Sequence, residues 1–258
     1  MVDDEGEKYA NQCEQCKCKK WKVDDFSMAF QPIYDVARGE IFAYEALVRG
    51  NHNEPALHVL SQVNEDNKYA FDQECRAKAI KLASSLGMDS VLSINFLPNA
   101  IYEPERCMAA TLRIATKYQF PTEKILFEFT EVEKLHDVEH VKRIIDYYNA
   151  LGFMTAIDDF GAGYSGLNLL AEFHPTIAKI DMSLIRGIDH SPSRQVIVKQ
   201  CVEMFRQLDV IPLAEGVETK AEFDFLNSIG ISLQQGYFIA KPEFEALPEP
   251  NLKHMGLI

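Results

Sequence analysis

Positive charge is scarce in this chain. Its 258 residues include 26 Lys and Arg against 39 Asp and Glu, which gives a net charge of −13. Proteins that bind nucleic acid polymers displace counterions from many phosphates with basic side chains, so this balance argues against such a partner. It does not exclude a small anionic ligand that is held through metal ions.

Long apolar runs are also missing. No run approaches the ~18 residues that a membrane-spanning helix requires, so we expect no membrane insertion. The first residues, MVDDEGEKYANQ, are acidic and polar, unlike a signal peptide. We therefore expect a cytosolic protein.

Cysteine is too sparse to indicate a disulfide framework, with six residues in a chain of this length. Three lie singly within helical patterns and are expected to be small core residues, namely Cys75, Cys107 and Cys201. The other three fall in the tract CEQCKCKKW, as Cys13, Cys16 and Cys18. A closed zinc site needs four ligands, and no His or fourth Cys lies nearby. A metal or redox site stays open here, but we favour an exposed tail or docking segment.

The chain after residue 22 alternates short β-rich runs with longer helical patterns. Eight runs are typical of strands: 27–33, 40–48, 91–97, 124–131, 154–160, 176–182, 211–217 and 233–239. The short turn YDVARGE predicts an antiparallel hairpin of the first two. A helical stretch follows each later run, which predicts parallel βα units. We therefore predict one TIM-barrel-like (β/α)8 domain over 23–258 with an antiparallel first strand, preceded by an N-terminal extension over 1–22.

Polar residues stand at the ends of most predicted strands, where buried strands should be apolar. They are Glu45, Asn95, Glu128, Asp158 with Asp159, Lys179 with Asp181, Glu215 and Gln235. Each alone could be a loop residue satisfied by water or a backbone amide. In a barrel, however, these strand ends converge on one face, where active sites form. So many carboxylates would repel each other and raise their pKa values unless cations lay among them, which indicates metal.

The stretch IDDFGAGYSG, residues 157–166, matches three motifs. Its G-x-G-x-x-G is typical of dinucleotide-binding folds, but Asp158 and Asp159 would then face a pyrophosphate without a counter-cation. Its D-F-G is shared with protein kinases, yet the H-R-D loop and the glycine-rich strand with its Lys are absent from the sequence. The third interpretation is a tandem carboxylate that bridges two metal ions, as in two-metal phosphodiester hydrolysis. Oxygen ligands favour Mg²⁺ or Mn²⁺, and the lack of His and Cys disfavours Zn²⁺.

The motifs YEALVRG, SINFLPN, FEFTE, IDDFGAGYSG, AKIDM, AEGVET and QGYFIAKP occur in the order found in EAL-domain cyclic di-GMP phosphodiesterases. The chain resembles that family from about residue 30 to 242. The resemblance implies hydrolysis of cyclic di-GMP to linear pGpG with two Mg²⁺ or Mn²⁺ ions, in a barrel with an antiparallel first strand. It also implies a homodimer, with the loop after Asp159 and the following helix at the interface.

The resemblance gives each matching residue an expected role. The implied metal ligands are Glu45, Asn95, Glu128, Asp158, Asp159 and Glu215, with Asp158 bridging. The implied catalytic residues are Lys179, which orients or deprotonates the attacking water, together with Glu45 and Glu218. The implied substrate contacts are Gln31, Arg49, Gln235 and Asp181. The residues expected to shape or steady the loop after Asp159 are Glu131, Glu218, Gly161 and Gly163.

Three positions depart from the family pattern: Leu97, Gly166 and Thr176. None is an implied metal ligand, so ligand contacts and loop stiffness are affected and not the chemistry. Two alternatives remain, a catalytically weak EAL protein that acts as a cyclic di-GMP receptor and a protein-interaction module. The full set of implied ligands favours the enzyme.

Overall fold

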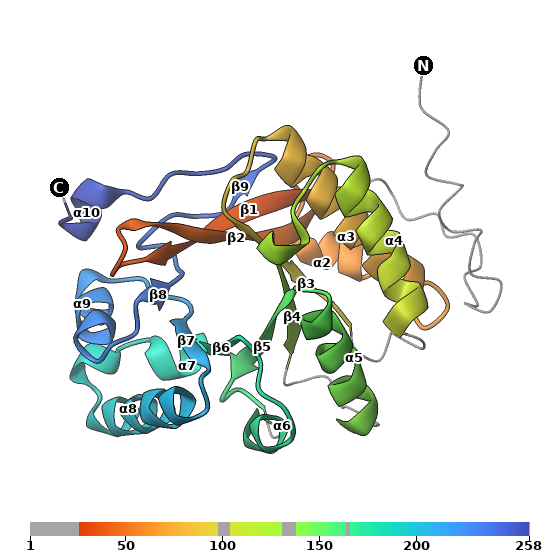
Figure 1. The fold of residues 1–258 in the computed structure, drawn as a ribbon. Coiled ribbons are helices and arrows are strands. Elements are labelled where there is room, and N and C mark those ends of the chain that lie inside the picture. The colour runs from red at the N-terminus through yellow and green to blue at the C-terminus, as the bar shows by residue number, and fades with distance from the viewer. Residues whose placement is uncertain (1–25, 98–103, 131–137, 164–165, 258) are drawn as a thin grey trace.

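The computed structural model describes residues 26–97, 104–130, 138–163 and 166–257 (Figure 1). The predicted N-terminal extension with Cys13, Cys16 and Cys18 lies outside these residues, as does Glu131. The extension and its boundary therefore stay predictions.

The strands form one nine-stranded sheet in the order β2-β3-β4-β5-β6-β7-β8-β1-β9, which the pairing of β1 with β2 closes into a barrel. Their bounds are β1 Phe26–Asp35, β2 Glu40–Gly50, β3 Val91–Asn95, β4 Ile125–Thr130, β5 Met154–Phe160, β6 Ile177–Ile180, β7 Ile211–Ala214, β8 Leu233–Gln234 and β9 Glu243–Phe244. Strand β1 runs antiparallel to β2 and β8, and the pairings from β2 to β8 are parallel. The predicted barrel with an antiparallel first strand is confirmed.

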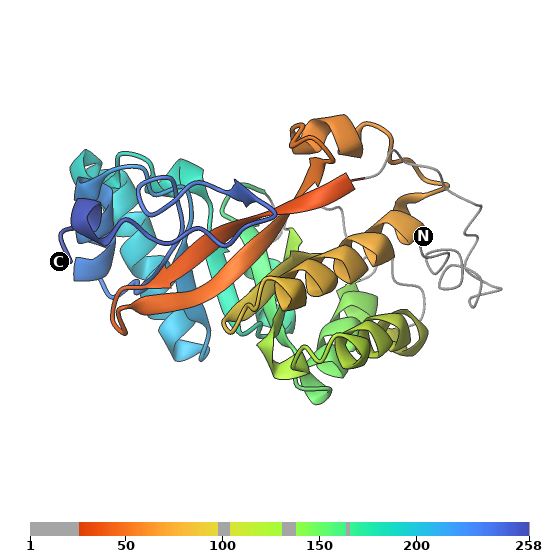
Figure 2. The ribbon, with the colours of Figure 1, turned by 90° about the horizontal axis from the view of Figure 1, so that it is seen from above.

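Helices surround the barrel (Figure 1). They are α2 Ala56–Leu60, α3 Lys68–Ser85, α4 Pro104–Lys117, α5 Val138–Ala150, α6 Gly166–Glu172, α7 Met182–Ile185, α8 Pro192–Gln207, α9 Lys220–Ser228 and α10 Leu252–Met255, with short 3₁₀ turns at Thr122–Lys124 and Ile188–His190. From above, the β1–β2 hairpin crosses the molecule and the C-terminal segment runs beside it (Figure 2). Within the described residues, every helix is too short or too polar to cross a bilayer.

Two apolar layers hold the barrel together. The larger lies between the strands and the helices and includes Phe127, Tyr148 and Phe205. The smaller fills the barrel interior, where Ile33, Ala43, Leu126, Ala156, Ile177, Leu213 and Leu233 pack against one another. Because side chains alternate along a strand, the residue two positions further on faces the interior as well.

The last two predicted strands were too long, as were those predicted over 91–97, 124–131 and 176–182. The last ends at Gln234 instead of residue 239, because the chain turns at Gly236, where an added Cβ would lie 2.1 Å from the carbonyl oxygen of Val217. The one before it ends at Ala214, because Gly216 takes a left-handed conformation with φ 65°. The two predicted strand tails are thus the loops that border the site.

Candidate metal and active site

A polar layer lies directly above the apolar layer inside the barrel, and it follows from the two-residue period of the strands. Each interior apolar residue is followed two positions later by a polar one. The pairs are Ala43 and Glu45, Leu126 and Glu128, Ala156 and Asp158, Ile177 and Lys179, Leu213 and Glu215, and Leu233 and Gln235. On the antiparallel β1 the order reverses, with Gln31 before Ile33. The expected convergence of these side chains at one barrel mouth is therefore present.

The ammonium of Lys179 lies at the centre of this layer and is fully buried. Its Nζ is 2.7 Å from a carboxylate oxygen of Glu128, 2.7 Å from Glu215 and 2.9 Å from Asp158. Glu45 lies further away, with 3.7 Å between Nζ and Oε2. One positive charge thus faces four carboxylates.

Glu45 accepts hydrogen bonds from two neutral side chains, one at the end of β3 and one just after β8. The Asn95 Nδ2 donates to Glu45 Oε1 at 3.0 Å, and the Gln235 Nε2 donates to Glu45 Oε2 at 2.7 Å. Gln31, paired with Glu45 in the β1–β2 register, donates to the carbonyl of Ala240 at 3.2 Å. These contacts bring Asn95 and Gln235 to the same carboxylate, and Gln31 lies opposite it on the paired strand.

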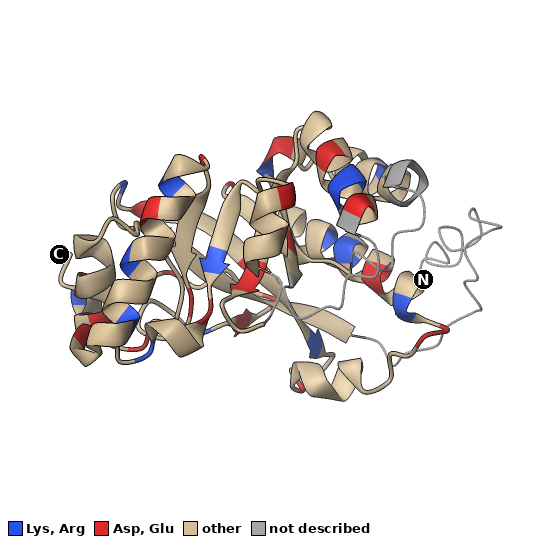
Figure 3. Ribbon diagram, turned by 90° about the horizontal axis from the view of Figure 1, so that it is seen from below, with Lys and Arg blue, Asp and Glu red and all other residues tan. Residues whose placement is uncertain are grey.

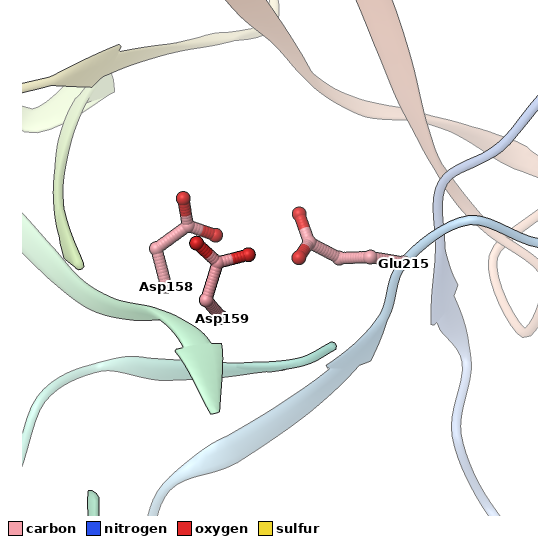
Figure 4. A group of neighbouring side chains, drawn as sticks. All are labelled: Asp158, Asp159 and Glu215. Carbon is pink, nitrogen blue, oxygen red and sulfur yellow. The ribbon is translucent and has the colours of Figure 1, made fainter. Parts of the chain in front are cut away.

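The tandem carboxylates of β5 face the same site because the strand is irregular there. In a regular strand two successive side chains point to opposite faces. The pairing of β5 with β6 shifts register between Ile157 and Phe160, and Asp159 takes a left-handed φ of 55°. Carboxylate oxygens of Asp158, Asp159 and Glu215 consequently lie within 4.8 Å of one another (Figure 4). A bulge of this kind is a common way to redirect a side chain at a functional site.

Burial and mutual repulsion disturb the protonation of these groups. Burial and the neighbouring carboxylates Glu45 and Asp158 raise the pKa of Glu128 to about 8, although Lys179 lowers it. Burial, Asp158 and Asp181 raise the pKa of Asp159 to about 6. Burial also raises the pKa of Glu215 well above its ordinary value.

Burial and the neighbouring charges act on the pKa of Lys179 in opposite directions. Burial lowers its pKa, but the surrounding carboxylates outweigh burial and raise the pKa well above the ordinary value for lysine. Its single charge is nevertheless insufficient for five neighbouring carboxylates, because three of them have raised pKa values. Such a set of oxygen donors, short of positive charge, fits divalent cations of the Mg²⁺ or Mn²⁺ type.

A cavity of about 280 Å³ opens beside the carboxylates. Among its lining residues are Gln31, Glu45, Asp159, Asp181, Arg186, Glu215, Glu218, Gln235 and Tyr237. The Asp181 side chain also accepts a hydrogen bond from the Ser183 backbone at 2.9 Å, which begins α7. A cavity with several convergent polar groups is the usual form of a small-molecule site.

Four expected site residues lie apart from the central carboxylates. Arg49 donates to the Val48 carbonyl at 2.7 Å, although it shares the interior face of β2 with Glu45. Glu218 is exposed and pairs with Arg186 at the cavity rim. Gly161 has a left-handed φ of 97° in the loop after Asp159, and Gly163 lies further along the same loop. Their expected roles stay predictions.

The structure adds two residues that the sequence prediction missed. Ser93 is fully buried on β3 and donates a hydrogen bond to Glu128. It lies two residues before Asn95, so strand alternation could have placed it on the same face. Arg186 could not be found this way, because it follows α7 and reaches the cavity through a loop.

Comparisons with known proteins agree on one family. The family model described as EAL domain matches residues 19–242. The blue light- and temperature-regulated antirepressor BluF of Escherichia coli is 33% identical over 221 residues, which cover 85% of this chain and 55% of BluF. The cyclic di-GMP phosphodiesterase PA2567 of Pseudomonas aeruginosa is 30% identical over 234 residues, which cover 88% of this chain and 39% of the relative. The chain thus spans about half the length of these curated relatives, or less.

Solved structures give the same answer. A standalone versatile EAL protein from Vibrio cholerae, in its c-di-GMP bound form, is 59% identical with a TM-score of 0.88, and the match covers 91% of this chain and 99% of that one. A manganese and cyclic di-GMP complex of Klebsiella pneumoniae BlrP1 is 31% identical with a TM-score of 0.81, covering 88% of this chain and 58% of BlrP1.

Proposed function

The chain belongs to the EAL domain family, and we propose that it is a phosphodiesterase that hydrolyses cyclic di-GMP to linear 5'-pGpG. The observation that carries this proposal is the polar layer at the barrel mouth, where four carboxylates face Lys179 and a fifth, Asp159, lies next to two of them beside a cavity. The named activity of PA2567 and the cyclic di-GMP bound to the Vibrio cholerae protein support it.

We assign two divalent cations, Mg²⁺ or Mn²⁺, to this layer. Glu45, Asn95, Glu128 and Asp158 would hold one, and Asp158, Asp159 and Glu215 the other. When bound, such ions lower the pKa of water and neutralise charge on the phosphate. The all-oxygen donor set and the manganese in the BlrP1 complex support the assignment.

Lys179 orients the attacking water in this proposal. Its carboxylate neighbours favour the ammonium form, which can donate hydrogen bonds to a water or a phosphate oxygen. Gln235, held against Glu45, lies at the cavity wall. A general base must first lose its proton, and any added positive charge near Lys179 lowers its pKa toward that role.

In this proposal the nucleotide binds in the cavity and is also contacted by Arg49, which lies outside the cavity lining. Arg49 offers two parallel donors to a phosphate oxygen once its guanidinium leaves the Val48 carbonyl. Gln31 and Asp181 line the cavity and present amide and carboxylate groups to polar edges of a base. Glu218 with Arg186 shapes the rim, and the loop that carries Gly161 and Gly163 sets the position of Asp159.

The remaining features of the proposal concern the whole protein. We expect a homodimer in the cytosol and no nucleic acid polymer as partner. On the face shown in Figure 3, residues of both charge signs lie among the outer helices of the described chain. A continuous basic face would be needed for a polymer.

A second candidate is a catalytically weak EAL protein that binds cyclic di-GMP and acts through a protein partner. The 33% identity to BluF, whose name describes an antirepressor, favours keeping it. One experiment separates the two. Purified protein is mixed with cyclic di-GMP and Mn²⁺, and pGpG is measured by chromatography while nucleotide binding is measured in EDTA. Binding without pGpG would establish the receptor, whereas steady release of pGpG establishes the enzyme.

A further inference from the structure

A buried ion pair lies on α3, outside the site described above. Asp72 and Arg76 are one helical turn apart and contact each other, with 5% and 1% of their side chains exposed. Two charges removed from water cost free energy that mutual attraction alone often fails to recover. A buried pair of this kind therefore calls for an account of what else it contacts.

The pair reaches the end of strand β3. Asp72 Oδ1 accepts a hydrogen bond from the Leu97 backbone N–H at 3.1 Å. The Arg76 guanidinium lies over two aromatic rings, 5.8 Å from the centroid of Phe96 and 5.4 Å from that of Phe127. The pair thus holds the two residues that directly follow Asn95.

Asn95 needs such support, because it is the last residue of β3 and is exposed. Backbone pairing fixes one side of this strand end, where the Phe96 N–H donates to the Glu128 carbonyl at 2.8 Å. Asp72 fixes the next peptide from the helix side. Together they restrain the backbone that directly follows Asn95, whose Nδ2 donates to Glu45 Oε1.

We propose that Asp72 is a positioning residue that holds Asn95 at the metal site through the Leu97 backbone, with Arg76 as its buried counter-charge. The inference rests on the proposed function, because it takes Asn95 as a metal ligand. Groups that orient metal ligands typically change metal affinity by about 10- to 100-fold when they are removed.

The test uses two double variants of the full chain that differ in one feature. Asp72→Leu with Arg76→Met removes both charges and the acceptor for the Leu97 N–H. Asp72→Asn with Arg76→Met removes both charges but keeps an acceptor oxygen. Apolar replacement of a buried ion pair is often tolerated, so both should fold. If the Leu variant does not melt cooperatively, Asp72→Ala with Arg76→Met takes its place.

The readout is Mn²⁺ binding without nucleotide, from the paramagnetic resonance signal of free Mn²⁺. We expect the Asn variant to bind Mn²⁺ close to wild-type affinity and the Leu variant to bind about tenfold more weakly. Equal affinities in the two variants would overturn the proposal. Ala83→Gly, in the last turn of the same helix, is the control for general loss of helix stability. It should lower the melting temperature without changing Mn²⁺ affinity.

A double-mutant cycle with Asn95→Ala tests whether Asp72 acts on the metal site through Asn95. If Asp72 acts through Asn95, the difference between the two double variants should disappear once Asn95 is replaced. A difference that persists would show that Asp72 affects the metal site by another route, and the proposal would fail. Because Mn²⁺ binding is measured without substrate, this result is independent of whether the wild-type protein releases pGpG.

Discussion

At the scale of single residues, Glu128 is the fully buried carboxylate on which the proposed chemistry most depends. Its two oxygens contact Lys179 and Ser93. We expect Glu128→Gln to lower pGpG release by at least about 10²-fold, because a neutral amide neither holds a cation as strongly nor balances Lys179. Glu123→Gln is the control, since Glu123 is exposed just before the same strand. Near-wild-type turnover in Glu128→Gln would remove the basis for the metal assignment.

Lys179 should behave differently from the carboxylates. Its ammonium and a divalent cation are attracted by the same carboxylates. We therefore expect Lys179→Ala to bind Mn²⁺ and cyclic di-GMP at least as tightly as wild type while turnover falls by about 10²-fold. Calorimetry measures the binding of Mn²⁺ and cyclic di-GMP, and the rate of pGpG release at saturating cyclic di-GMP measures turnover. Weak binding with unchanged saturated turnover would instead make Lys179 a substrate clamp.

Sequence alone predicted which charged residues converge at the barrel mouth, because polar residues at strand ends stand out against apolar strands. Glu45, Glu128 and Lys179 were found in this way, and the structure brings them together. Ser93 gave no such signal, because a serine within a strand is also tolerated as a neutral core residue. The direction of the Arg49 side chain was equally inaccessible, because it depends on a local backbone acceptor.

At the scale of elements, the irregular end of β5 positions Asp159, a proposed ligand of the second metal ion. Gly161 has a φ of 97°, and an added Cβ would lie 2.6 Å from Leu184 Cδ1 on α7. We expect Gly161→Ala to displace Asp159 and to raise the Mn²⁺ concentration for half-maximal activity roughly tenfold. High Mn²⁺ should restore much of the rate, because mass action fills a weakened site.

Gly152 supplies the matched control for this prediction. It precedes β5 with a φ of 85°, and an added Cβ would meet nothing within 4 Å. Gly152→Ala therefore introduces the same left-handed backbone strain, about 1–2 kcal/mol, but no clash. It should lower the stability of the fold without changing the Mn²⁺ requirement. The assignment of Asp159 would be contradicted if both variants shifted the Mn²⁺ requirement equally.

The order of elements was predictable because turn residues and two periodicities recur along the chain. The antiparallel hairpin and the parallel units that follow it were found as expected. The register shift at Asp159 was not predictable, since a regular β pattern fits the same letters. The ends of β7 and β8 were missed because the apolar residues Val217, Phe238 and Ile239 are buried in loops and not in strands.

At the scale of the whole molecule, the site affects the stability of the fold. The pKa of Glu128 is raised from 4.5 to about 8, and that of Asp159 from 3.8 to about 6. At pH values between the ordinary pKa and the raised pKa of each group, the folded state binds more protons than the unfolded state. The free energy of unfolding therefore falls as pH rises. The raised pKa of Lys179 lies above this range, so lysine adds no slope there.

The last prediction is therefore a pH dependence that metal reverses. In EDTA, we expect the melting temperature to fall by about 3–6 °C for each pH unit between pH 5 and 8, since one proton of difference is worth about 1.4 kcal/mol per unit. Glu128→Gln should reduce this slope, because the amide does not titrate. Added Mg²⁺ should raise the melting temperature more at pH 8 than at pH 5, since cations bind deprotonated carboxylates. A Mg²⁺ effect that is equal at both pH values would show that these carboxylates do not hold the cation.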